Sequence, residues 1–267
     1  MESSLFGVPY ALTVLPGLAV IILAMTLLWA ASLPLKDASI VDPFWGPGFL
    51  LVAAVTALVW SVSSLRGWLV LGCVALWALR LGGHLLRRNR SHGEDPRYAR
   101  WREDHGAAFW WVSLFKIFWL QALLLWIVAW PLMLAVVSEG GIGGWDLAAL
   151  VVFTAGFLCE AVADAQLHRF RQDPANEGKV LDTGLWRYSR HPNYFGDALL
   201  WWGLYLFAVG AGAWWTLFGP VVMTVLLLKV SGVSLLEEDI EERRPAYADY
   251  IRRTSAFIPL PPKDPDA

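Results

Sequence analysis

The chain has 267 residues, of which 57% are hydrophobic and only 16% are charged, and its formal net charge is −2. A soluble domain carries about 25% charged residues, so this composition argues against an ordinary soluble protein. The two cysteines, Cys73 and Cys159, lie inside apolar runs and match neither a disulfide framework nor a zinc pattern. We expect no metal site and no nucleic-acid partner.

Seven apolar segments are candidates for helices that cross a bilayer, each of which needs about 20 residues. They are residues 10–32, 44–63, 67–86, 109–137, 147–165, 197–210 and 213–236. The sixth segment is short, and Pro131 predicts a kink in the fourth. No linker divides the chain, so we expect one all-α, multi-pass membrane domain over residues 1–267, in contact with the lipid bilayer.

The basic residues predict the orientation of these spans, because Lys and Arg collect in cytoplasmic loops. With seven spans, 17 of the 21 Lys and Arg residues fall in the loops and tail on one side of the membrane. The opposite side carries only Arg66. We therefore expect the N-terminus outside and the C-terminus in the cytoplasm.

Polar residues recur at helical spacing on three of the predicted helices. The fifth carries Glu160 and Asp164 within its span and His168 and Arg171 beyond it. The third carries Trp77, Arg80, His84 and Arg87, and on the seventh Lys229 and Glu237 mark the face that leads into the acidic tail. Charges inside spans are unfavourable and usually face a cavity or each other. One interpretation is a set of ion pairs with snorkelling ends. The other is a cytoplasm-facing cavity for an anionic ligand.

The segment 182–197, DTGLWRYSRHPNYFGD, has the highest density of polar residues. Pro192 suits the first turn of a helix, which would place Asn193 and Asp197 on one face just after Arg187 and Arg190. Unpaired N–H groups and the helix dipole would add to these cations in binding a phosphate or carboxylate. His191 could donate to a phosphate or simply pack. No G-x-G-x-x-G motif, P-loop or H-E-x-x-H motif is present, so any nucleotide would be bound without a Rossmann fold.

Three strings carry a resemblance to a known family: ADAQLHRFRQDP, LDTGLWRYSRHPNYFGD and KVSGVSLLEEDIEERRPAYADYIRRTSAFIPL. They resemble the C-terminal half of the steroid 5α-reductases, and more specifically their bacterial membrane relatives. The resemblance is strongest over residues 150–262. It is looser at DASIVDPFWGPGF and RLGGHLLRRNRSHGEDPRYARWRE, so it extends over most of the chain.

The resemblance implies a seven-helix bundle that binds NADPH in its cytoplasmic half and receives a steroid-like lipid from the membrane. For a bacterial relative, this membrane would be the inner one. At matching positions it implies cofactor contacts from Asp164, Arg171, Asn193 and Asp197. It further implies that the same pocket is lined by Arg187, Arg190, His191 and Tyr194.

The reaction that the resemblance implies is hydride transfer to the β-carbon of a conjugated enone, followed by protonation of the enolate. The protein would then stabilise negative charge on the carbonyl oxygen. A protonated, buried Asp42 at the start of the second span is a candidate for this task. The alternative role for Asp42 is a helix N-cap. Animal members place a glutamate on the second span and a tyrosine on the third, where this chain offers Asp42 and Trp77.

Two further functions remain open. A membrane methyltransferase of the isoprenylcysteine carboxyl type, dependent on S-adenosylmethionine, shares the R-H-P-x-Y-x-G string and the pair Glu237–Glu238. The preceding D-T-G-L-W-R-Y string, together with Asp164 and Arg171, favours the reductase. The non-enzymatic alternative is a lipid-binding or transport protein with an ion-pair core.

Overall fold

The computed structural model describes residues 4–5, 8–89, 93–230, 232–237, 240 and 247–263. It is helical apart from a short antiparallel hairpin of two strands, β1 (Ser4–Leu5) and β2 (Val8–Pro9). Two compact units make up the chain: the first is Met1–Asp146 with Phe207–Gly219, and the second is Leu147–Leu206 with Pro220–Ala267.

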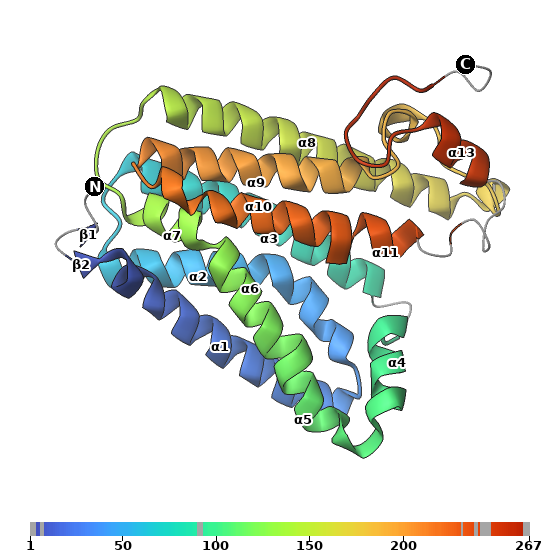
Figure 1. Cartoon of the computed structure of the whole chain (residues 1–267), viewed down its shortest axis with the longest axis horizontal. Coiled ribbons are helices and arrows are strands. Elements are labelled where there is room, and N and C mark those ends of the chain that lie inside the picture. The colour runs from blue at the N-terminus through green and yellow to red at the C-terminus, as the bar shows by residue number, and fades with distance from the viewer. Residues whose placement is uncertain are drawn as a thin grey trace. The chain divides into compact units, whose positions relative to one another are not determined.

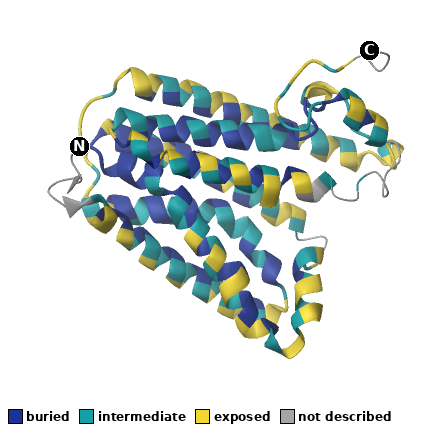
Figure 2. Ribbon diagram, viewed as in Figure 1, coloured by how far each residue is buried: buried dark blue, intermediate teal, exposed yellow. Residues whose placement is uncertain are grey.

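The first unit is built from helices that follow one another along the chain (Figure 1). Its complete helices are α1 (Tyr10–Leu35), α2 (Val41–Trp60), α3 (Leu65–Asn89), α4 (Pro96–His105), α5 (Phe109–Ser113), α6 (Leu120–Val128) and α7 (Trp130–Val137). Helix α2 packs against both α1 and α3. Buried positions alternate with exposed ones along these helices (Figure 2), as expected for apolar helices with one face on a core and the other toward lipid.

Small residues bring α2 and α3 into backbone contact. A methyl group on Gly46 would lie 3.0 Å from the carbonyl oxygen of Ala78, and one on Gly82 would lie 3.0 Å from that of Pro43. Close approach through glycine is a common basis of helix packing in membranes, where burial of apolar surface drives association little. It fixes the N-terminal half of α2 against the C-terminal half of α3.

The fourth predicted span is interrupted twice. A π-helical stretch, Leu114–Trp119, separates α5 from α6, and Ala129 separates α6 from α7. Pro131 lies in the first turn of α7, where its missing N–H removes no helical hydrogen bond. The helix break expected near Pro131 is therefore confirmed, and it lies at Ala129, two residues before the proline.

Helix α4 was not predicted, because its sequence is polar and lies in a segment that we expected to be a loop. Asp95 caps it, with its side chain accepting from the N–H of Arg97, and Pro96 occupies the first position. An Asp-Pro pair of this kind is a recognised helix start, so the sequence did hold a signal for α4.

A buried ion pair organises the loop that precedes α8. The guanidinium group of Arg66 donates to both carboxyl oxygens of Asp146, at 2.6 and 3.0 Å. It also donates to Ser138 Oγ and to the carbonyl oxygens of Glu139 and Gly141. Arg66 and Asp146 are 5% and 0% exposed. Arg66, the one basic residue expected on the outer side of the membrane, therefore stabilises the fold.

The second unit contains the greater part of α8 (Gly144–Gln172) and α9 (Pro192–Gly210), which run side by side (Figure 1). Its other helices are the C-terminal part of α10 (Phe218–Val225), then α11 (Val233–Glu237) and α13 (Tyr247–Arg253). Between α8 and α9 the chain forms two short 3-10 turns, at Pro174–Asn176 and Gly184–Arg187.

Five helical stretches of the described chain are long and apolar enough to cross a membrane. They are Tyr10–Leu35, Ala38–Trp60, Leu65–Asn89, Pro96–Val128 and Gly144–Gln172. The protein is therefore an integral membrane protein by the length and composition of its helices. The sixth predicted span, residues 197–210, lies within α9, whose first turn contains Pro192 as predicted, and the seventh contains the shorter apolar run Trp214–Val230. The number seven and the orientation stay predictions.

Candidate functional site

Helices α8 and α9 approach so closely that their backbones touch. A methyl group on Gly156 would lie 2.4 Å from the backbone nitrogen of Leu200, and one on Gly196 would lie 2.4 Å from that of Glu160. Only glycine fits at such crossings without a shift of the helices. The polar residues of α8 are thereby placed directly opposite those at the start of α9.

Asp164 and Asn193 meet across this contact. Asn193 Nδ2 donates to Asp164 Oδ1 at 3.1 Å, and Asp164 is 8% exposed. Because the carboxyl oxygen accepts, the amide nitrogen must face it, and Asn193 Oδ1 points elsewhere. That oxygen is buried and has no hydrogen-bond partner among the described residues. A ligand that donates a hydrogen bond, such as a ribose hydroxyl or a carboxamide, would satisfy it.

The predicted polar stripe on α8 divides into two parts. Glu160 and Asp164 are buried, whereas His168 and Arg171 are exposed. Asp197, one turn beyond Asn193 on α9, is also buried, at 7% exposed. The buried carboxyl groups of Glu160, Asp164 and Asp197 are thus hydrogen-bond acceptors, whereas Arg171 of the same stripe is exposed.

The turn that precedes α9 is tied to α8. Trp186 Nε1 donates to the carbonyl oxygen of Ala163 at 3.1 Å, and Leu185 N donates to Gln166 Oε1 at 3.0 Å. Arg187 is exposed beside them. The helix itself begins at Pro192, as the sequence predicted.

Most of the N–H donors of the Arg190 side chain form hydrogen bonds with other residues of the protein. Its Nε and Nη2 donate to the two carboxyl oxygens of Glu237, at 2.7 and 2.8 Å. Its Nη1 donates to the carbonyl oxygens of Ile251 and Thr254, at 3.1 and 2.6 Å. In this structure Arg190 therefore joins the turn before α9 to α11 and to the C-terminal segment, and its use by a phosphate stays a prediction.

His191 shares the same carboxylate. Its Nε2 lies 2.9 Å from Glu237 Oε1, and because a carboxylate only accepts, Nε2 must carry the hydrogen. The ring stacks on Tyr194, with the ring centres 5.8 Å apart. In the neutral ring, Nδ1 is then an acceptor. This geometry favours a contact with a donor group over the phosphate contact that we had considered for His191.

The pKa of Glu237 reflects these contacts. Burial raises the pKa of the carboxyl group, but the hydrogen bonds and charges of Arg190 and His191 outweigh burial and lower it to about 2. The pKa of Arg190 is raised, because the Glu237 carboxylate outweighs its burial. Glu238, the other half of the predicted acidic pair, lies outside the described residues.

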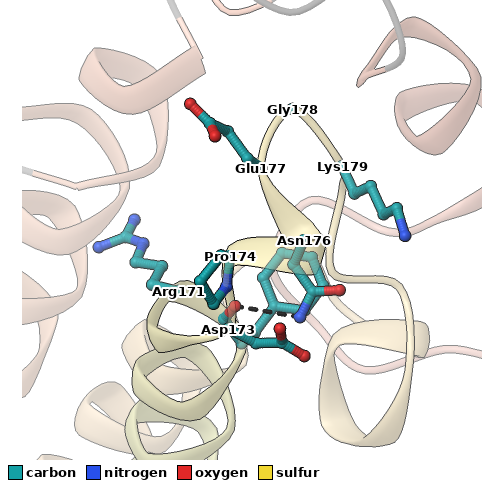
Figure 3. Close-up of a pocket in the computed structure, with 8 residues that line it drawn as sticks. Arg171, Asp173, Pro174, Asn176, Glu177, Gly178 and Lys179 are labelled. Atoms are coloured by element: carbon teal, nitrogen blue, oxygen red, sulfur yellow. Dashed lines mark hydrogen bonds between the residues drawn. The ribbon is translucent and has the colours of Figure 1, made fainter.

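A surface pocket of about 340 Å³ lies at the C-terminal end of α8 (Figure 3). Arg171 and Lys179 point to opposite sides of the loop that forms it, and Asn176 Nδ2 donates to the carbonyl oxygen of Phe170 at 3.1 Å. Asp173 caps the 3-10 turn by accepting from Ala175 N. Of the predicted cofactor residues, only Arg171 lines this pocket.

The two residues predicted to act on the substrate lie in the first unit. Asp42 is the second residue of α2, and it is Asp37 that caps the preceding 3-10 turn by accepting from Ser39 N. The N-cap interpretation of Asp42 is therefore wrong. Its Oδ1 accepts instead from the hydroxyl group of Tyr98 at 2.9 Å, and its Oδ2 lies 3.5 Å from Arg97 Nη2.

Tyr98 was missed by sequence reasoning because it lies on the unpredicted helix α4, 56 residues from Asp42. It is 6% exposed, and its hydroxyl group also accepts from Gln121 Nε2 at 3.3 Å. Trp77 is fully buried against Phe49, with the ring centres 5.7 Å apart. Because Phe49 lies seven residues beyond Asp42 on α2, Trp77 is about 10 Å along the helix from the Asp42–Tyr98 pair.

All eight predicted cofactor residues belong to the second unit, and no three His, Cys, Asp or Glu side chains of the described chain group together as metal ligands would. Residues 28–254 match a family described as a protein of unknown function, DUF1295. The chain belongs to this family. The match covers α2 through α9 in full and continues to residue 254, so it includes residues of both units.

A relative of the chain is an uncharacterized protein of Schizosaccharomyces pombe. It is 29% identical over 276 aligned residues, which cover 91% of this chain and 78% of the yeast protein. No solved structure matches the chain.

Proposed function

We propose that this DUF1295 protein reduces the C=C bond of a conjugated enone in a steroid-like lipid, with NADPH as the hydride donor. The observation that carries the proposal is the pairing of Asp164 with Asn193, which leaves the buried amide oxygen of Asn193 without a hydrogen-bond partner in the described part of the chain. These are two of the residues at which the sequence resembles the steroid 5α-reductases. Their hydrogen bond joins two different helices, α8 and α9.

The residues fit a dinucleotide in two ways. The orphan oxygen of Asn193 and the buried carboxyl groups of Asp164 and Asp197 would accept from ribose hydroxyls or a carboxamide. Arg171 and Arg187, both exposed, would bind phosphate groups. When bound, the nicotinamide supplies the hydride, and the protein residues orient the reacting groups and stabilise charge.

On the substrate side, the proposal assigns the carbonyl oxygen of the enone to the Asp42–Tyr98 pair. Hydride addition at the β-carbon places negative charge on that oxygen, and a hydrogen-bond donor in a site shielded from water stabilises it. In this structure Tyr98 donates its one hydroxyl hydrogen to Asp42 and accepts from Gln121. With Asp42 protonated, the carboxylic acid would donate to the Tyr98 oxygen instead, and the Tyr98 hydroxyl group would then donate to the enone oxygen. Tyr98 would thus supply the phenol that animal members of the resembled family carry on the third span.

The methyltransferase alternative is tested by ligand-dependent stability. The Arg190–Glu237–His191 cluster uses motifs that both families share, so it favours neither function. A ligand that binds only the folded state raises the unfolding temperature, and the rise grows with the logarithm of the ligand concentration relative to its Kd. We expect NADPH to stabilise the purified protein and S-adenosylmethionine to leave it unchanged. The reverse result would replace the reductase by the methyltransferase.

A further inference from the structure

The last described segment of the chain, residues 255–263, has no regular secondary structure and is attached to the turn before α9. Its position is set by main-chain and side-chain hydrogen bonds rather than by packing alone. They run from Arg190 N to Ser255 O at 2.8 Å, from Ser189 Oγ to Phe257 O at 2.8 Å, and from Leu260 N to Tyr188 O at 2.9 Å. The segment therefore cannot turn its outer side chains inward without breaking these bonds.

The backbone of this segment is unusual in leaving no N–H group unpaired between residues 259 and 263. Pro259, Pro261 and Pro262 have no N–H group. Leu260 N is bonded to Tyr188, and Lys263 N donates to the carbonyl oxygen of Arg253 at 2.8 Å. An irregular backbone is normally excluded from lipid because its polar groups lose water. Here the donors have already been satisfied or removed.

The side chains of the same segment are apolar and uncovered. Ile258 is 57% exposed and Leu260 is 53% exposed, and the neighbouring Tyr188 is 43% exposed. Ile258 and Leu260 lie on either side of Pro259 in the chain, so their two exposed side chains are close neighbours in sequence. Two cations are exposed nearby in the chain. Arg187 directly precedes Tyr188, and Lys263 follows Leu260 by three residues. A small apolar patch with cations beside it is the composition of a membrane-interface anchor.

The height of the patch along α8 is fixed by the Trp186–Ala163 hydrogen bond. Residues 147–165 of α8 form the apolar part that we expect to span the bilayer, so Ala163 lies at its end. Helix α8 continues to Gln172, about 14 Å beyond Ala163 at 1.5 Å per residue. The turn before α9, and the segment bonded to it, thus lie where a spanning α8 would leave the hydrocarbon.

We propose that residues 258–262 insert into the headgroup–acyl boundary of the leaflet at this end of α8. Ile258 and Leu260 enter the acyl region, and the Lys263 side chain binds phospholipid phosphate groups. The partner is the same bilayer that the helices span, with anionic lipids preferred. This anchor holds the turn Trp186–His191 at a fixed depth, and it does not depend on the proposed reductase activity.

The test measures the depth of the segment in lipid. The full-length protein is prepared without its native thiols, as Cys73→Ala with Cys159→Ala, and reconstituted in nanodiscs of phosphatidylcholine and phosphatidylglycerol. A nitroxide label is placed by Leu260→Cys or, in a second sample, by Ile258→Cys. Arg252→Cys, on the exposed face of α13, is the matched control. Relaxation of each label by oxygen, which partitions into lipid, is compared with relaxation by a water-soluble nickel complex.

We expect the ratio of oxygen to nickel relaxation to be several-fold higher at positions 258 and 260 than at position 252. Equal ratios at the three positions would overturn the proposal, because the segment would then lie in water. A defined distance between labels at position 260 on two protein molecules in one nanodisc would also overturn it, since a second copy of the chain would then cover the patch. A higher ratio in nanodiscs containing phosphatidylglycerol than in phosphatidylcholine alone would support the contact of Lys263 with phosphate groups.

Discussion

Arg190 and Glu237 form a two-point ion pair across 47 residues of sequence, with nitrogen–oxygen distances of 2.7 and 2.8 Å. The side chains are 9% and 19% exposed, so the pair is largely shielded from solvent. It connects the turn before α9 with α11, and through Arg190 it also holds the carbonyl groups of the C-terminal segment. The segment 182–197 is thus held in place by residues that come 47 to 64 positions after Arg190 in the chain, Glu237, Ile251 and Thr254.

Replacing Glu237 by Gln should destabilise the second unit by about 3–5 kcal/mol, because it leaves the buried guanidinium group of Arg190 without a counter-charge. The free energy of unfolding can be measured by denaturant titration in detergent micelles. The matched control is Asp249→Asn, which weakens the exposed pair with Arg252. Its cost should stay within about 1 kcal/mol. Equal losses in the free energy of unfolding for the two variants would show that the Glu237 cluster stabilises the protein no more than an exposed ion pair does.

The Glu237 cluster also predicts an acid sensitivity. In the unfolded chain this carboxyl group takes up a proton near pH 4.5, whereas in the folded protein it does so only near pH 2. Between these values the unfolded state binds more protons, so stability falls as the pH is lowered. The contribution of Glu237 is complete above about pH 4.5 and disappears as the pH approaches 2. The stability difference between wild type and Glu237→Gln should therefore be constant at neutral pH and shrink below pH 4.5. A difference that persists unchanged to low pH would contradict this assignment.

The ion pair between Arg66 and Asp146 predicts a non-additive double mutant. Arg66→Met leaves the fully buried Asp146 carboxyl group unpaired and should cost about 3–5 kcal/mol. Asp146→Leu should be similarly harmful, because the Arg66 guanidinium group then lacks its partner. The double variant removes both charges and should be more stable than either single variant. Additive losses in unfolding measurements on the four proteins would rule out a direct coupling.

Much of the fold could be predicted from the sequence, since apolar runs in lipid can only be helices. The extents of α1, α2 and α3 were confirmed to within a few residues, as was the start of α9 at Pro192. Helix α4 was missed because a polar helix has no apolar periodicity. Asp42 was considered as a cap because local sequence shows the helix boundary but not the preceding 3-10 turn.

The candidate site could be predicted in part. Glu160, Asp164 and Asn193 could be placed on helix faces from their spacing, and Asp164 and Asn193 do meet. The partners of Asp42 and Arg190 could not be found in this way, because Tyr98 and Glu237 are 56 and 47 residues away. Spacing within one helix carries no information about contacts of that length.

Asn193→Ala should sharply reduce NADPH-dependent turnover and weaken NADPH binding, because it removes both the contact to Asp164 and the buried acceptor. Gln172→Ala, which alters an exposed amide at the end of α8, is the control and should behave as wild type. Turnover and cofactor-dependent thermal stabilisation are measured on the same preparations. Wild-type values for Asn193→Ala would remove this residue from the cofactor site.

Asp42→Asn and Tyr98→Phe should lower the rate of enone reduction while leaving NADPH affinity intact, because neither residue is among those proposed to bind the cofactor. The loss of one charge-stabilising donor typically costs about 10²–10³ in kcat. Trp77→Phe preserves the buried aromatic ring and should change the rate much less. A wild-type rate in Tyr98→Phe would remove Tyr98 from the substrate site.

The most direct test of the proposed function is to mix the purified protein in nanodiscs with NADPH and a Δ4-3-oxo steroid, and to follow the absorbance of the reduced nicotinamide. Loss of absorbance only when the enone is present, with a product that has gained two hydrogens, is the result that the proposed function predicts. Unchanged absorbance with a range of enones, together with stabilisation by S-adenosylmethionine and not by NADPH, would contradict it.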